Sequence, residues 1–90
     1  MTKHSKIRAV CLRPFADEWE QPTPDEVREV LRLANLSGSE AARYVGITEG
    51  RTIRRWTGGD SAIPYACWAL LCHAAGLGLI WFAEQDSDTQ

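Results

Sequence analysis

The first clear helical pattern in the chain begins at Thr23, after which apolar residues recur every three or four positions. The threonine can cap a helix, Pro24 suits the first helical position, and Glu26 completes a capping box. The apolar stripe consists of Val27, Val30, Leu31 and Ala34. We therefore predict a helix from about residue 24 that buries this stripe.

Residues 36–59 predict two shorter helices around a tight turn. Ser37 and Glu40 form a second capping box, and the small apolar residues that follow allow close packing of two helices. Gly46 can adopt a positive φ and end the first helix. Thr48 is the candidate cap of the second helix, which we expect at about residues 50–57.

On the second of these helices, Ile53 and Trp56 are three positions apart and are predicted to face the core. The outer side is left to polar residues, namely Arg51, Thr52, Arg54 and Arg55. Guanidinium groups can bind phosphates or form paired hydrogen bonds with guanine. An ordinary solvated helix face is the alternative explanation.

A further helix is expected after Ile63-Pro64, with one apolar face and an end at Gly76. That face consists of Trp68, Leu71, Cys72 and Ala75. Residues 7–12 and 77–82 are short apolar runs that could form two strands of a small β-ribbon, within one chain or between two. A fifth helix over residues 77–83 is the competing interpretation, and periodicity does not decide between them.

With these elements the sequence resembles the lambda repressor-like helix-turn-helix family of phage repressors and Cro proteins, over roughly residues 24–77. The motifs that carry the resemblance are Leu36-Ser37, Glu40 with Ala42, Val45-Gly46-Ile47-Thr48, Thr52-Ile53, Arg55-Trp56, Gly59 and Ile63-Pro64. The resemblance implies a mainly all-α, four- to five-helix domain, commonly dimeric, whose third helix lies in the major groove of DNA.

Among these residues, Arg51 and Arg55 are the first candidates for contacts with base edges, because an arginine fork can bind O6 and N7 of guanine. Arg43 and Arg54 would contact the DNA backbone, although a salt bridge with Glu40 is an equal alternative for Arg43. The other candidate contacts are Ser37, Gly38, Ser39, Thr48, Gly50 and Thr52. Many family members have a phosphate-binding glutamine where this chain has Gly38, so the amides of this helix start are expected to take that role.

The interval from Thr48 to Trp56 is about one residue longer than is usual in the family, which shifts the start of the second helix. At the other end of the chain, residues 1–13 contain four basic residues and no acid. Lys6 and Arg8 are therefore candidates for an arm that enters the minor groove, and a disordered basic start is the alternative.

Composition adds three expectations. The chain of 90 residues has a formal net charge of −2, but its charges are segregated, so local basic surfaces matter more than the sum. We expect a single domain over residues 1–90, with a core at about 23–77 and the helix-turn-helix at about 37–57. A core of this size often needs support from a second copy, which favours a homodimer.

Several classes of protein are disfavoured by the sequence. No run of about 18 apolar residues predicts a membrane span, and the basic N-terminus does not resemble a signal peptide, so a cytoplasmic location is expected. Three cysteines without close paired spacing fit buried thiols better than disulfides. Cys67, Cys72 and His73 have poor metal-ligand spacing, and no catalytic motif is present. We expect no metal, no cofactor and no enzymatic activity.

The sequence therefore predicts a sequence-specific regulator that binds double-stranded DNA. The favoured form is a dimeric repressor of a phage, plasmid or other mobile-element promoter, acting on a roughly palindromic operator. Its own promoter is one candidate target. The alternative is an interaction module, such as an antitoxin or a co-regulator subunit, that docks a protein partner through residues 77–82.

Overall fold

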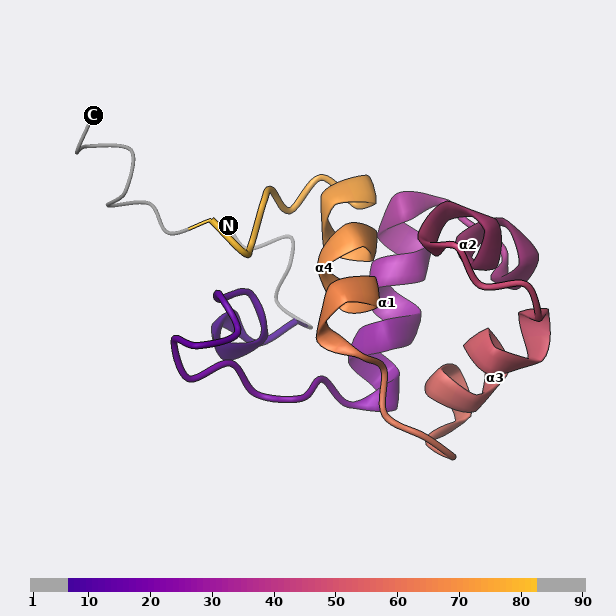
Figure 1. Ribbon diagram of the computed structural model, residues 1–90, viewed down its shortest axis with the longest axis horizontal. Coiled ribbons are helices and arrows are strands. Elements are labelled where there is room, and N and C mark those ends of the chain that lie inside the picture. Colours follow the sequence, from indigo (N-terminus) through magenta and orange to yellow (C-terminus); the bar gives the residue numbers. More distant parts are fainter. Residues whose placement is uncertain (1–6, 83–90) are drawn as a thin grey trace.

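The computed structural model describes residues 7–82, in which four α-helices follow one short 3₁₀ turn (Figure 1). The elements are η1 (Ala9–Cys11), α1 (Pro24–Ala34), α2 (Gly38–Val45), α3 (Gly50–Gly58) and α4 (Tyr65–Ala74). Helix α1 packs against α3 and α4, and α2 packs against the same two helices. The described residues contain no β-strand, which confirms the mainly all-α prediction.

Both predicted capping boxes are present. The Glu26 amide donates to the Thr23 hydroxyl at 3.2 Å, and the Thr23 amide donates to the Glu26 carboxylate at 2.7 Å. At the start of α2, Ser37 and Glu40 make the same pair of bonds, at 3.2 and 2.9 Å. Helix α2 ends at Gly46, whose φ of 84° lies in the left-handed region as predicted. Local sequence therefore sets the bounds of these two helices.

The core lies where the inner faces of the four helices meet. Its largest fully buried side chains include Trp68, Ile53, Ile63 and Leu71. The carbonyl of Cys11 accepts hydrogen bonds from two indole groups, those of Trp68 at 2.7 Å and Trp19 at 2.9 Å. These bonds hold the N-terminal segment against α4, because the buried carbonyl has no water to replace its partners.

The predicted β-ribbon of residues 7–12 and 77–82 is absent from the described residues, and so is the alternative, a fifth helix after α4. Residues 7–12 contain the single 3₁₀ turn η1, and residues 77–82 form neither a strand nor a helix. The first run is buried through Ile7 and Cys11, so it needs no partner strand to cover it. In the second run, Gly76 and Gly78 have φ values of 84° and 90°. Left-handed residues at these two positions stop α4 from continuing.

The end of α3 gives a test of packing against α1. Gly59 caps this helix with a φ of 87°, and an added Cβ would lie 3.2 Å from the Pro24 side chain. We expect Gly59→Ala to lower the free energy of unfolding by about 1–2 kcal/mol, the cost of a left-handed alanine. Urea denaturation measures this loss. The control is Gly58→Ala, whose Cβ meets no atom within 4 Å, and equal stability of the two variants would contradict the prediction.

Candidate nucleic-acid interface

Helix α3 divides into a buried side and an exposed basic side. Ile53 and Trp56 are only 1% and 4% exposed, as predicted, and they fix the helix against the core. Thr52 is half-buried, while Arg51, Arg54 and Arg55 are exposed. Because one side of α3 is fixed by packing, its three guanidinium groups share one outward-facing surface.

The three arginines of α3 differ in their charge partners. Arg51 forms an ion pair with Glu49 at 3.5 Å, and both side chains are more than half exposed. Neither Arg54 nor Arg55 forms an ion pair with any described residue. Their positive charge is thus not neutralised within the part of the chain that the structure describes, and it can attract an anionic ligand.

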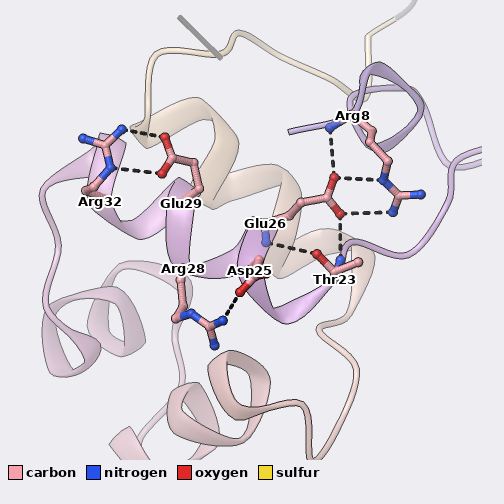
Figure 2. A pocket seen from close by; sticks show the side chains of 7 residues that line it. All are labelled: Arg8, Thr23, Asp25, Glu26, Arg28, Glu29 and Arg32. Carbon is pink, nitrogen blue, oxygen red and sulfur yellow. Dashed lines mark hydrogen bonds and ion pairs between the residues drawn. The ribbon is translucent and has the colours of Figure 1, made fainter. Parts of the chain in front are cut away.

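Other arginines contrast with this pair, because they are held by acidic residues around α1. Figure 2 shows Arg32 beside Glu29 and Arg28 beside Asp25, both on the same helix. The Arg28 guanidinium also donates to the carbonyl of Thr57, which ties α1 to the end of α3. These arginines stabilise the helix bundle, and their charge is balanced locally.

Helix α3 starts one residue later than the predicted cap at Thr48 requires. The cap position belongs to Glu49 instead of Thr48, and no side chain of the described residues caps this helix. Thr48 is exposed and lies one residue too early, since the helix begins at Gly50. The first amides of α3 have no acceptor in the helix itself, so they can donate to a phosphate.

The start of α2 lies in the same helix-turn-helix unit. Ser37 and Glu40 cap each other, while the amides of Gly38 and Ser39 are in the first turn, where no intrahelical acceptor exists. Hydrogen bonds from Ser37 lower the pKa of Glu40, and the charge of Arg43 adds to this effect. Arg43 is exposed and makes no ion pair with Glu40 or with any other described residue.

Arg8 was a candidate for an arm that contacts DNA, and the structure shows its partners within the chain. Its guanidinium donates to the Glu26 carboxylate at 2.9 and 3.0 Å, and its backbone amide donates to the same carboxylate at 2.9 Å (Figure 2). The side chain also bonds Glu20 and the Gln21 carbonyl. Arg8 is thus bound to α1 and its preceding loop. Lys6 lies outside the described residues.

Sequence reasoning missed this Arg8–Glu26 contact. Glu26 was identified only as a capping residue, yet it is 3% exposed and serves both the cap and Arg8. The pairing spans 18 positions, and no local pattern indicates a contact at that separation. A basic residue within an apolar N-terminal run was the one available signal.

The three cysteines are partly or wholly buried, and burial raises the pKa of each thiol. Burial raises the pKa of the Cys72 thiol to about 12, and burial together with the Glu26 charge raises that of Cys11 to about 11. Both thiols therefore stay protonated at neutral pH. Within residues 7–82, no group of three potential metal ligands gathers, and no helix is long and apolar enough to cross a membrane.

Comparison with known proteins gives two relatives that cover most of the chain. One is the transcriptional repressor protein KorC of Escherichia coli, 59% identical over 83 residues, which are 90% of this chain and 96% of the relative. Another KorC protein of Escherichia coli is 60% identical over 77 residues, or 83% of this chain and 89% of the relative. No protein-family model matches the sequence. No solved structure matches it either.

Proposed function

The chain belongs to the family of the transcriptional repressor KorC, and from this premise we propose that it represses transcription by binding double-stranded DNA through α3. The proposed fold family is the lambda repressor-like helix-turn-helix class, with the whole chain as one DNA-binding domain. No catalytic step is needed, since a protein bound at a promoter can block it by occupancy.

One observation carries this proposal. Helix α3 is anchored by Ile53 and Trp56, and its outer side presents Arg54 and Arg55 without an acidic partner among the described residues. An α-helix fits the major groove of B-DNA, where a guanidinium group can donate to both O6 and N7 of guanine. The geometry of α3 therefore suits direct reading of bases.

Within this proposal, Arg51 and Arg55 contact base edges and Arg54 contacts a phosphate. Release of Arg51 from Glu49 costs little, because exposed ion pairs contribute only about 0–1 kcal/mol. Arg43 and the amides at the start of α2 position the DNA backbone. The remaining proposed contacts are Ser37, Gly38, Ser39, Thr48, Gly50 and Thr52.

The proposed active form is a homodimer on a roughly palindromic operator, with half-sites separated by about one helical turn, on the order of 10 base pairs. The promoter of a phage, a plasmid or another mobile element is the proposed target, and the protein's own promoter is the first candidate. Two copies of α3 would then read two adjacent major grooves on one side of the duplex.

The test is a mobility shift with DNA from upstream of the protein's own coding sequence, compared with a scrambled duplex of equal length at two salt concentrations. We expect a clear preference for the upstream DNA and weaker binding to both duplexes at higher salt, because phosphate contacts release counterions. Equal binding to both duplexes would contradict sequence-specific repression at this promoter. No binding to either would contradict the DNA-binding proposal and favour a protein-docking module.

Single arginine replacements separate base reading from phosphate contact. We expect Arg55→Ala to reduce the free-energy difference between specific and nonspecific binding by about 1–3 kcal/mol, the range for one paired guanine contact. Arg54→Ala should instead weaken binding to both duplexes by a similar factor. Titrations of both variants against the same two duplexes measure these ratios. An unchanged ratio for Arg55→Ala would exclude a base-reading role for this residue.

A further inference from the structure

The sequence from residue 61 to residue 83 contains no aspartate, glutamate, lysine or arginine. This interval includes the whole of α4, of which only one side packs against α1 and α2. Its other side exposes Ala66, Leu70 and His73. A helix that is apolar on all sides is normally buried on all sides, because exposed helix faces carry charged residues. The outer side of α4 is therefore unusual for a surface that faces water.

A groove runs along this uncharged side. Its lining is almost entirely apolar and consists of Tyr65, Ala66, Ala69, Leu70 and Trp81. Phe15 extends the surface, since its ring lies 5.5 Å from that of Tyr65. Leu79 and Phe82 are also exposed, on the segment that carries Trp81. We refer to the groove together with Phe15, Leu79 and Phe82 as the α4 patch.

The size of the α4 patch is close to what a protein interface needs. Large aromatic side chains can bury about 150–250 Å² each. Three exposed aromatic residues and two exposed leucines of the patch therefore present on the order of 500 Å² together, namely Phe15, Trp81, Phe82, Leu70 and Leu79. A stable interface buries about 800 Å² on each partner. The five side chains alone would supply more than half of such an interface.

We propose that the α4 patch binds a second copy of this chain in a two-fold dimer, with Trp81 of each copy seated in the groove of the other. The small side chains of Ala66 and Ala69 leave room for a large ring, and Trp81 lines the same groove while remaining 43% exposed. A two-fold interface requires one surface to offer both the protruding group and its receptor. The α4 patch has both features.

One observation favours a copy of the chain over a foreign partner. The absence of charge between residues 61 and 83 lets this surface face itself without repulsion between like charges.

The position of the α4 patch agrees with DNA binding by such a dimer. Figure 1 shows α3 at one end of the helix bundle, with α4, the N-terminal loop and the segment after α4 at the opposite end. Contact through the α4 patch therefore leaves α3 of both copies uncovered. The inference rests on the proposed function for the use of two copies, and it adds the surface by which they associate.

Sedimentation equilibrium without DNA tests the dimer directly. We expect wild-type protein to have twice the chain mass of 10.1 kDa at micromolar concentration. Trp81→Glu and Leu70→Glu should each raise the dissociation constant of the dimer at least 100-fold, because the dimer would bury each new carboxylate twice. The matched control is Tyr44→Glu on α2, since Tyr44 is 44% exposed and Trp81 is 43% exposed. Far-ultraviolet circular dichroism of each variant verifies that it is folded.

A folded wild-type monomer at these concentrations would overturn the inference, as would a dimer unaffected by both patch substitutions or weakened equally by Tyr44→Glu. The result is independent of DNA binding. A dimer that binds no DNA would contradict the proposed function and leave the interface standing. A monomer that still prefers the upstream DNA would contradict the interface alone.

Discussion

Replacement of Glu26 by alanine is expected to lower the free energy of unfolding by about 2–4 kcal/mol, because it removes hydrogen bonds between charged groups, which contribute about 1.5–3 kcal/mol, and one bond of the α1 capping box. The carboxylate is nearly inaccessible and accepts five hydrogen bonds: three from Arg8, one from the Thr23 amide and one from the Cys11 thiol. The substitution removes the carboxylate half of the α1 capping box together with the anchor of the N-terminal segment, while the bond from the residue 26 amide to the Thr23 hydroxyl remains. Urea denaturation at neutral pH measures the loss.

The matched control is Glu20→Ala, because Glu20 contacts the same Arg8 guanidinium at 3.2 Å but is 61% exposed. Exposed pairs contribute about 0–1 kcal/mol, so this variant should remain close to wild type. Equal losses in the two variants would show that burial of Glu26 has no special effect on stability, contrary to this prediction.

The same carboxylate predicts how stability depends on pH. Burial by itself would raise the pKa of Glu26, but hydrogen bonds from Arg8 and Thr23 outweigh it and lower the pKa from 4.5 to about 2. A lowered pKa means that the contribution is complete above pH 4.5 and is lost as the pH falls towards 2. The loss should be about 3 kcal/mol, and Glu26→Gln should remove this part of the acid destabilisation.

The helices could be predicted because their signals are local. The Thr23 and Ser37 capping boxes, the Gly46 stop and the inward spacing of Ile53 and Trp56 all act within a few residues. The same spacing left the arginines of α3 on the outer side, where the structure has them. Short-range geometry thus determined most of the fold and the surface of the candidate site.

The chain ends could not be predicted, because their structure depends on distant contacts. Residues 7–12 are held by the bonds of the Cys11 carbonyl to Trp19 and Trp68, and by the pairing of Arg8 with Glu26. None of these partners is within seven positions. An apolar run looks alike whether a strand or a neighbouring helix covers it, so periodicity could not distinguish these environments.

The prediction with the largest expected effect on DNA binding concerns Arg54 and Arg55 together. We expect the double variant Arg54→Ala, Arg55→Ala to lose about 10²–10⁴-fold in affinity for the specific site, since each such contact contributes about 1–3 kcal/mol. The slope of log affinity against log salt should fall by about one for the lost phosphate contact of Arg54. Stability should change little, because both side chains are exposed and lack described ion pairs.

A more negative net charge alone would weaken binding to any DNA, so the control must change the net charge of the chain by the same amount at another place. Arg13→Glu does this, because it also lowers the net charge by two and changes a residue of the segment between η1 and α1, outside the helix-turn-helix. Its only described ion pair is a 3.9 Å contact with the exposed Glu18. If binding depends on the α3 surface, the double variant loses the specific complex while Arg13→Glu retains it. Equal losses would mean that overall charge, and not the placement of Arg54 and Arg55, governs DNA binding.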